Sequence, residues 1–170
     1  SENKLTDSEK VVKEAITRIP KNTEAWKLWS HINLELYEQN HETSYIVSSI
    51  EGSLNGLVLS PDDSLSFTLR ILSILFRYGC KEIYQLFLTR LASIPVHVWI
   101  NVLPQIIARS SSDDEQLKQI ICELLSSVGL EYPHVALYSL MVPLKNEASS
   151  RQKVASQIYD KLSNKYPEIV

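Results

Sequence analysis

The sequence predicts an all-α fold: an α-solenoid of antiparallel helix pairs with about nine helices, in a single domain over residues 1–170. Apolar residues recur three and four positions apart in one segment after another, which is the pattern of helices with one apolar face. Glycine is scarce, with four residues in 170, whereas the turns of a β-rich domain would need more. Short polar turns join the segments, so consecutive helices should lie antiparallel.

The stretch Pro95 to Arg109, PVHVWINVLPQIIAR, is the one around which we expect the other helices to stack. Pro95 suits the first turn of a helix. Apolar residues of one broad face follow at helical spacing, namely Val98, Trp99, Val102, Leu103, Ile106 and Ile107. Pro104 interrupts this pattern, because an interior proline removes a backbone donor and costs about 3 kcal/mol. We therefore expect either one kinked helix or two short helices that meet there.

Two helices are predicted before residue 40. Thr6 and Glu9 form a capping-box pattern, which places the N-cap of the first helix at Thr6, and Pro20 ends that helix. A short polar turn leads into the second helix, which opens with Trp26 and has Trp29 one turn later. A proline that closes one helix, followed by this tryptophan pair, is similar to the start of a tetratricopeptide repeat.

The third to fifth helices follow over residues 43–93. Gly52 and Gly56 lie four apart on one face of the third helix, which predicts close packing against a neighbouring helix. The fourth helix, from Leu65 to Phe76, has apolar residues nearly all round, so we expect it to be buried at the centre of the stack. Gly79 is expected to end it as a left-handed cap, and the fifth helix spans residues 81–93.

Three more helices are predicted after the Pro95–Arg109 stretch. The acidic residues Asp113 and Asp114 lie where a helix N-terminus favours negative charge, and Gly129 is expected to close the helix that follows. Pro133 opens the eighth helix. The ninth runs from about Ala148 and stops before the proline at position 167. These helices complete the predicted stack.

Composition argues against several classes of protein. The net charge of −3 gives no support to nucleic-acid binding, which normally requires a basic domain or stripe. No apolar run approaches the roughly 20 residues needed to span a membrane, and no signal peptide is visible. Cys80 and Cys122 lack the spacing of a zinc site or a disulfide framework. We expect them to be buried, reduced thiols of an intracellular, cytoplasmic protein.

No arrangement of residues in the sequence indicates catalysis. The four histidines are scattered without metal-ligand spacing, so no metal is expected. There is no nucleophile elbow and no glycine-rich nucleotide loop, so no cofactor is expected either. The pairs Asp62-Asp63 and Asp113-Asp114 resemble carboxylate dyads, but both lie at predicted helix N-termini. The chain is therefore expected not to be an enzyme by itself.

Arg109 stands out because it ends a strongly apolar helix, one turn after Gln105 on the same face. Two roles remain open for its side chain. A cation at a helix C-terminus stabilises the helix dipole. Alternatively, the guanidinium bonds across to the next helix pair and sets the angle between the pairs.

Five segments in order resemble one protein family. Trp99–Arg109, WINVLPQIIAR, closely resembles the W-L-x-V-I-P-Q-L-I-A-R stretch of the FAT region in target-of-rapamycin kinases. Four further segments are similar to other stretches of that region. Ala25–Glu35 is similar to A-W-H-x-W-A-x-x-N-x-E, and Glu131–Leu140 to H-P-Q-A-L-I-Y-P-L. The other two segments are Ile50–Ser60 and Ser64–Gly79. The kinases of the DNA-damage and nonsense-decay branches share weaker versions of these segments.

The chain departs from the family pattern at several positions. Leu75 replaces the tryptophan of the fourth helix, Ser53-Leu54 replaces an aromatic pair, and Ser139 replaces a proline. Glu24 stands where the family has a basic residue associated with inositol-phosphate binding. These departures put a ligand site in doubt and indicate a divergent member.

The resemblance implies a mechanical role. In the family, the FAT region is a helical-repeat clamp around the kinase domain, and it leads into a rapamycin-binding helical bundle before which this chain would stop. The implied partners are the kinase domain, neighbouring repeats and other subunits of the kinase complex, and the parent would be a serine/threonine kinase in nutrient and growth signalling. The residues expected to matter for packing and interfaces are Trp26, Trp29, Trp99, Pro104, Gln105, Arg109 and Pro133.

Two other functions remain as alternatives. One is a free-standing adaptor of the tetratricopeptide or HEAT kind, which would bind a partner protein or peptide in its groove. The other is an all-helical enzyme, against which the lack of polar constellations argues. A clamp segment should expose apolar faces at both ends. The first helix is expected to be polar on its outer face, with Glu9, Lys10 and Lys13, whereas the tail Tyr166–Val170 resembles a cut end.

Overall fold

The structure is a computed structural model that describes residues 2–110, 112–144, 156 and 160. Its described part is all-α, as predicted, and consists of helices packed as in a HEAT-like solenoid. The chain divides into two compact units at Pro95, and each is described by itself. The expectation of a single domain stays a prediction. The helices are α1 (Glu2–Arg18), α2 (Thr23–Asn40), α3 (Thr43–Leu59), α4 (Leu65–Tyr78), α5 (Lys81–Leu91), α6 (Leu103–Ala108), α7 (Glu115–Glu131) and α8 (Pro133–Leu144).

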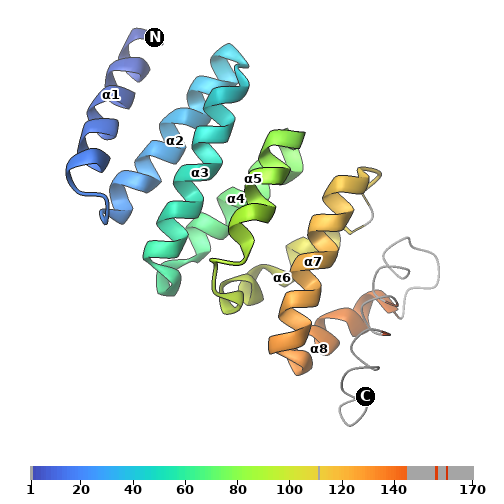
Figure 1. Ribbon diagram of the computed structural model, residues 1–170. Helices are drawn as coiled ribbons and strands as arrows, with labels where there is room; N and C mark the ends of the chain where they lie inside the picture. The colour runs from blue at the N-terminus through green and yellow to red at the C-terminus, as the bar shows by residue number, and fades with distance from the viewer. Residues whose placement is uncertain (1, 111, 145–155, 157–159, 161–170) are drawn as a thin grey trace. The chain divides into compact units, whose positions relative to one another are not determined.

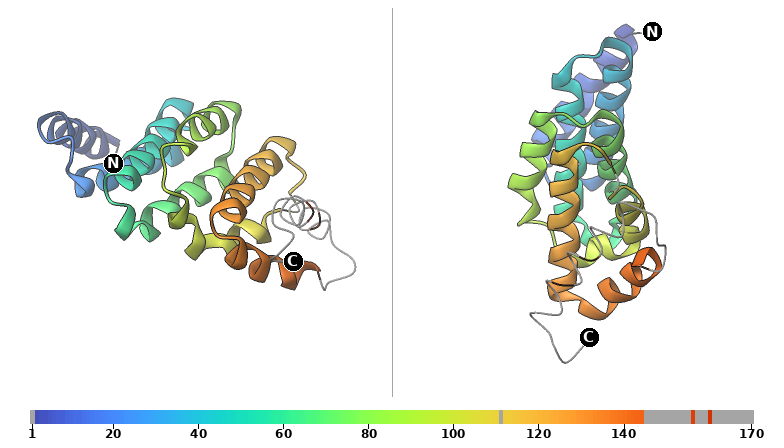
Figure 2. Two further views of the ribbon diagram at one scale, coloured as in Figure 1. Left: turned by 60° about the horizontal axis from the view of Figure 1, so that its bottom comes forward. Right: turned by 90° about the vertical axis from the view of Figure 1, so that its right-hand side faces the viewer.

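In the first unit the helices from α1 to α4 each pack on the next along the chain. Helix α2 lies between α1 and α3, and α3 also contacts α4 and α5 (Figures 1 and 2). The Asn22 side chain caps the start of α2, where it accepts a hydrogen bond from the backbone N–H of Ala25. The core contains buried aliphatic and aromatic residues from α2 to α5, among them Leu36, Ile46, Ile50, Leu54, Leu57, Ile71, Ile74, Ile83 and Phe87.

The first helix begins earlier than the sequence predicted. Helix α1 starts at Glu2, so Thr6 lies inside it and the capping-box interpretation is wrong. Residues upstream of Thr6 already form helical turns, since the Ser8 hydroxyl donates to the carbonyl of Lys4 at 2.8 Å. A hydroxyl residue near a helix start has two possible uses, as an N-cap or as an i−4 donor within the helix, and sequence alone does not separate them.

The glycines of α3 lie at close contacts, as predicted. A Cβ added at Gly52 would be 2.8 Å from Cδ1 of Trp29 on α2 and 3.2 Å from the backbone carbonyl oxygen of Trp26. A Cβ at Gly56 would overlap the ring of Phe67 on α4. The two glycines therefore let α3 approach helices on two sides.

Gly79 is not a left-handed cap, contrary to the prediction. Its backbone has φ −51° and ψ 127°, and glycine is needed because a Cβ there would be 2.6 Å from the carbonyl oxygen of Leu75 and would overlap the ring of Tyr84. The left-handed residue is His41, with φ 54°, which ends α2 and donates its backbone N–H to the carbonyl of Tyr37 at 2.8 Å. A glycine after a helix usually indicates a left-handed cap, whereas Gly79 is required by its close contact with Tyr84 of α5.

Helix α4 is not buried on all sides, which corrects a second expectation. Leu65 is 50% exposed and Leu69 is 40% exposed, although Phe67, Ile71 and Ile74 are buried. The exposed leucines lie four residues apart and so share one face of the helix with polar neighbours. An apolar count over all sides of the helix overstated its burial, because it ignored the serines and arginines that mark an outer face.

In the second unit, the Pro95–Arg109 stretch forms two short helices, which is one of the two predicted arrangements. A 3-10 helix, η2 (Val96–Val102), is followed by α6. Pro104 lies in the first turn of α6, where a backbone N–H would make no hydrogen bond within the helix, so a proline is tolerated there. The six residues of the predicted apolar face are all buried: Val98, Trp99, Val102, Leu103, Ile106 and Ile107. Both short helices pack against α7, and α6 also contacts α8.

Helix α7 has the predicted start and apolar face but a different end. The Asp114 side chain caps it, accepting from the backbone N–H groups of Gln116 and Leu117 at 2.9 and 3.1 Å. Gly129 does not close the helix, as had been predicted; it is buried inside α7, which continues to Glu131. Helix α8 opens at Pro133 as expected and packs on α7. The apolar residues of the predicted ninth helix, Val154, Ile158, Tyr159 and Leu162, lie outside the described residues.

Candidate functional site

The tryptophans of α2 are half-buried at its packing surface. The Trp26 indole N–H donates to the carbonyl of Pro20 at 2.8 Å and so fixes the turn between α1 and α2. Trp29 packs against a small cluster of Val12, Ile32 and Leu36 that joins α1 to α2. Both tryptophans therefore act in packing neighbouring helices within the first unit.

The remaining predicted residues lie in the second unit. Trp99 is 1% exposed, whereas Pro104 and Gln105 are exposed. Arg109 forms the exposed C-cap of α6, and its backbone N–H donates to the carbonyl of Ile106 at 3.1 Å. Pro133, half-buried, begins α8. The structure thus divides the seven predicted residues between two units; Trp26 and Trp29 line a small hollow of about 240 Å³ together in the first unit. The functional roles of all seven residues stay predictions.

A buried serine cluster that the sequence analysis missed joins α2 to α3. The hydroxyl oxygens of Ser30 and Ser53 are 2.7 Å apart, and Ser49 donates to the backbone carbonyl of Ser30 at 2.7 Å. All three side chains are fully buried, so each hydroxyl depends on its neighbours for a partner. A detectable signal was the run of small residues at helical spacing on α3, of which only the glycines had been recognised.

An open apolar groove lies between α1 and α2. One part of it, about 630 Å³, is lined by Val11, Val12 and Leu28 together with Arg70 of α4. An adjoining part of about 490 Å³ shares those three apolar residues and continues to Lys4 and Leu5. Val11 is 67% exposed and Leu28 is 47% exposed. The outer face of α1 carries exposed charged residues, among them Lys10 and Lys13, as the sequence suggested, and Val11 is an exposed apolar residue beside the groove.

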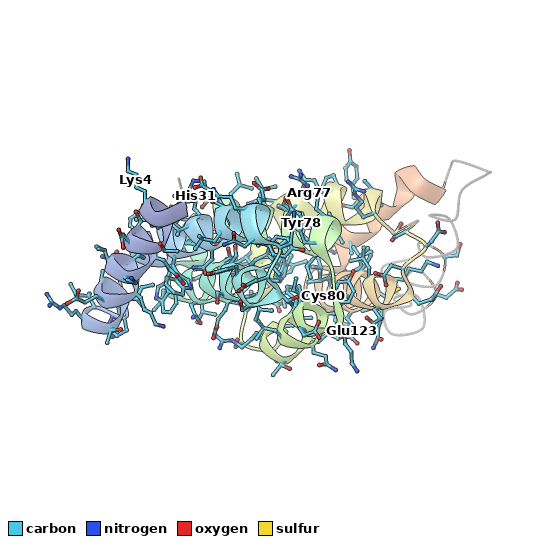
Figure 3. The ribbon with its side chains drawn as sticks, turned by 90° about the horizontal axis from the view of Figure 1, so that it is seen from above. Lys4, His31, Arg77, Tyr78, Cys80 and Glu123 are labelled. Carbon is cyan, nitrogen blue, oxygen red and sulfur yellow. The ribbon has the colours of Figure 1, made fainter. Side chains whose placement is uncertain are left out.

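Arg70 of α4 is one of several charged residues that line this groove. It is half-buried, and burial lowers the pKa of its guanidinium, while the nearby Glu35 carboxylate raises that pKa. Glu35 also lies 3.0 Å from the Nε2 atom of His31 on the exposed side of α2. Figure 3 shows His31 on α2 and Lys4 near the start of α1, the two helices that form the groove.

A cluster of aromatic and charged residues joins the ends of α2 and α4. The Tyr78 hydroxyl donates to the Glu38 carboxylate at 2.7 Å, and the rings of Tyr78 and Tyr37 pack edge to face with centroids 5.2 Å apart. The guanidinium of Arg77 lies 5.1 Å from the centre of the Tyr78 ring, and Figure 3 shows the two residues side by side. The hydrogen bond to Glu38 raises the pKa of Tyr78 above its ordinary value.

The cysteines differ from their predicted burial. Cys80 and Cys122 are both thiols and are only half-buried. Cys80 immediately precedes α5, where partial burial raises the pKa of its thiol. A raised thiol pKa reduces the fraction of reactive thiolate at neutral pH. The exposure arises because Cys80 lies at a helix end rather than within the apolar face.

Within the part of the chain that the structure describes, no three histidine, cysteine or acidic side chains come together as metal ligands. Among the same residues, no helix combines the length and the apolar character that crossing a bilayer requires.

Comparison with known proteins gives the family. Residues 82–169, just over half of the chain, match the family described as "Serine/threonine-protein kinase ATR-like, HEAT repeats". The chain belongs to this family. Its match covers the Pro95–Arg109 stretch and α7, whose buried apolar faces are described above.

Relatives of this HEAT-repeat chain include the TOR kinases. It is 32% identical over 135 residues to the serine/threonine-protein kinase TOR2 of Saccharomyces cerevisiae, covering 79% of the chain and 6% of the relative. It is 29% identical over 151 residues to TOR of Oryza sativa subsp. japonica (81% and 6%) and 26% identical over 174 residues to mTor of Drosophila melanogaster (86% and 7%). The chain thus spans about 6–7% of the length of these relatives.

Proposed function

We propose that the chain is a non-catalytic scaffold segment in the FAT region of a TOR-like serine/threonine protein kinase. The observation that carries the proposal is the similarity to TOR kinases along 79–86% of this chain, which corresponds to only 6–7% of each relative. The sequence has no glycine-rich loop, catalytic-loop aspartate or DFG triplet, so the chemistry would belong to another part of a parent chain. The proposed setting is the cytoplasm.

The proposed work of the segment is mechanical. The glycines of α3 allow close approach of its neighbours, and the buried serines join α2 to α3 by hydrogen bonds, so both features favour the observed spacing of these helices. In the second unit, the fully buried Trp99 holds η2 in its packed position. A clamp of such helices would bias a kinase domain between open and closed states through the angles between its helix pairs.

The proposed partners follow from this role. They are the kinase domain and neighbouring helical repeats of the parent chain, with other protein subunits of a TOR-like complex. Arg109, exposed at the end of α6, is a candidate for a contact with such a neighbour. Its alternative role at the helix C-terminus remains a hypothesis as well.

A second candidate function is a free-standing helical-repeat adaptor. The observation that favours it is the apolar groove between α1 and α2, which has the form of a peptide-binding groove. An adaptor would be complete as a small protein, whereas a scaffold segment would be part of a very long one.

The length of the native protein separates the two candidates. An immunoblot of the source cells with an antibody against this segment should give a band more than ten times larger than the 19.4 kDa chain, as its share of 6–7% of its relatives requires. The immunoprecipitate of that band should phosphorylate serine or threonine in a protein substrate. A single band near 19.4 kDa would refute the kinase scaffold and leave the adaptor.

A further inference from the structure

We propose that Ser112 is a phosphorylation site for a serine kinase that recognises acidic residues after the serine. Ser112 lies in the second unit, in the connection between α6 and α7 (Figure 1). The proposal goes beyond the proposed function, because it holds for a scaffold segment and for an adaptor alike. It names the modified atom, the class of enzyme that modifies it and the residues that this enzyme reads.

Three consecutive serines follow Arg109, and the structure separates the first from the third. Ser110 is 2% exposed and its hydroxyl donates to the backbone carbonyl of Ile107 at 2.8 Å, so it cannot enter an active site without local unfolding. Ser111 lies outside the described residues. Ser112 is partly exposed and belongs to no helix. Among the described serines of this run, Ser112 is therefore the one that another protein can reach.

The hydrogen bonds of Ser112 are confined to the connection itself. Its backbone N–H donates to the carbonyl of Arg109 at 3.1 Å, and its hydroxyl oxygen accepts from the backbone N–H of Asp114 at 3.3 Å. The bond to the hydroxyl lies beyond the usual range of a short N–H to O bond. A kinase can therefore take up the Ser112 hydroxyl without separating α6 from α7.

Three exposed acidic residues follow Ser112 directly, namely Asp113, Asp114 and Glu115. Asp114 also caps α7, and Glu115 lies 2.7 Å from Lys118, so part of this charge serves the start of the helix. All three carboxylates face solvent, where they form a short negative strip beside the hydroxyl. Kinases distinguish substrates by charge patterns of this kind, and a basic substrate groove complements this one.

Phosphorylation would change the charge of the connection. The Ser112 oxygen attacks the terminal phosphorus of ATP, the bond from that phosphorus to ADP breaks, and the hydroxyl proton passes to a base of the kinase. The phosphate adds about 1.5–2 negative charges at pH 7 to a segment that already has three carboxylates. The modified connection would then attract a basic neighbour more strongly and repel an acidic one.

One basic residue offers a competing signal. Arg109 lies three positions before Ser112, where a kinase that reads basic residues would use it. Three carboxylates after the serine outweigh one guanidinium before it, so the charge pattern favours an acidic-directed enzyme. The experiment below separates the two classes of kinase.

Labelling of the native full-length protein tests the assignment. The protein is treated with phosphatase, separated from it, and incubated with ATP, Mg²⁺ and either casein kinase 2, which is acidic-directed, or cyclic-AMP-dependent protein kinase, which is basic-directed. Ser93 is the matched control, because it is exposed between α5 and η2 and is followed by Ile94, Pro95 and Val96 instead of acidic residues. By mass spectrometry, we expect phosphate on Ser112 with the acidic-directed kinase and none on Ser93.

Variants identify what the kinase reads. Ser112→Ala should abolish the label, and the double variant Asp113→Asn, Glu115→Gln should lower kcat/KM for phosphorylation of Ser112 about tenfold. Asp114 is kept in both, because it caps α7. Arg109→Gln should leave the rate unchanged.

Each contrary result has a distinct meaning. Ser112 labelled no faster than Ser93 would refute the site. An unchanged rate without the two carboxylates, or labelling that depends on Arg109, would refute the acidic-directed kinase. Protein isolated from growing and from starved source cells, without phosphatase treatment, should have phosphate on Ser112 in at least one state, and its absence from both would refute use of the site in the cell. None of these results depends on the length of the native protein, which tests the proposed function.

Discussion

Replacing Trp99 with alanine should remove a large part of the stability of the second unit. Trp99 is 1% exposed and packs in η2, which contacts both α6 and α7. A tryptophan buries about 150–250 Å², worth about 4–6 kcal/mol at 25 cal/mol per Å². The compactness of the unfolded chain reduces this figure, and we expect a loss of about 3–5 kcal/mol, as for other buried aromatic truncations.

Urea unfolding of the 170-residue chain, followed by circular dichroism, measures this loss. The matched control is Trp26→Ala, because Trp26 is half-buried and should cost about half as much. Trp99→Phe keeps an aromatic ring and should cost less than the alanine variant. If Trp99→Ala shifts the unfolding transition no more than Trp26→Ala, the assignment of Trp99 to the packed face of η2 is wrong.

Three further predictions concern a helix contact, a cap and a titration. Gly52→Ala gains about 1 kcal/mol of helix propensity but places a Cβ 2.8 Å from the Trp29 ring. Overpacking of this kind typically costs about 1–3 kcal/mol, so the urea midpoint should fall. A higher midpoint would show that the indole moves aside freely. Asp114→Ala should destabilise the chain by about 1 kcal/mol in the same assay, because it removes the N-cap of α7. Asp114→Asn should destabilise it much less, since an asparagine side chain also caps a helix. Equal losses in the two variants would contradict the capping role. The raised pKa of Tyr78 means that its bond to Glu38 stabilises the fold below the ordinary tyrosine value of 10.0 and is lost as the pH rises through the higher folded value. The melting temperature of wild type should therefore exceed that of Tyr78→Phe at neutral pH, and the difference should shrink above about pH 10; a constant difference would contradict this bond.

The sequence by itself determined where most helices lie and which face of each is apolar. The apolar residues predicted for Pro95–Arg109 and for α7 are buried in the structure. These predictions succeeded because the 3.6-residue period of a helix is a local property that the chain displays directly. The helix starts at Asp114 and Pro133 were predicted for the same reason, since each cap involves residues within one turn.

Only the tertiary structure decided which apolar and small residues have partners. Leu28 and Leu65 have the same side chain as the buried Leu36 yet are exposed, because burial depends on whether a second helix covers that face. The contact of Gly79 with Tyr84 of α5 and the hydrogen bond between Ser30 and Ser53 likewise depend on how helices meet. The candidate groove was therefore invisible in the sequence, because it is defined by the width that α1 and α2 leave open between them.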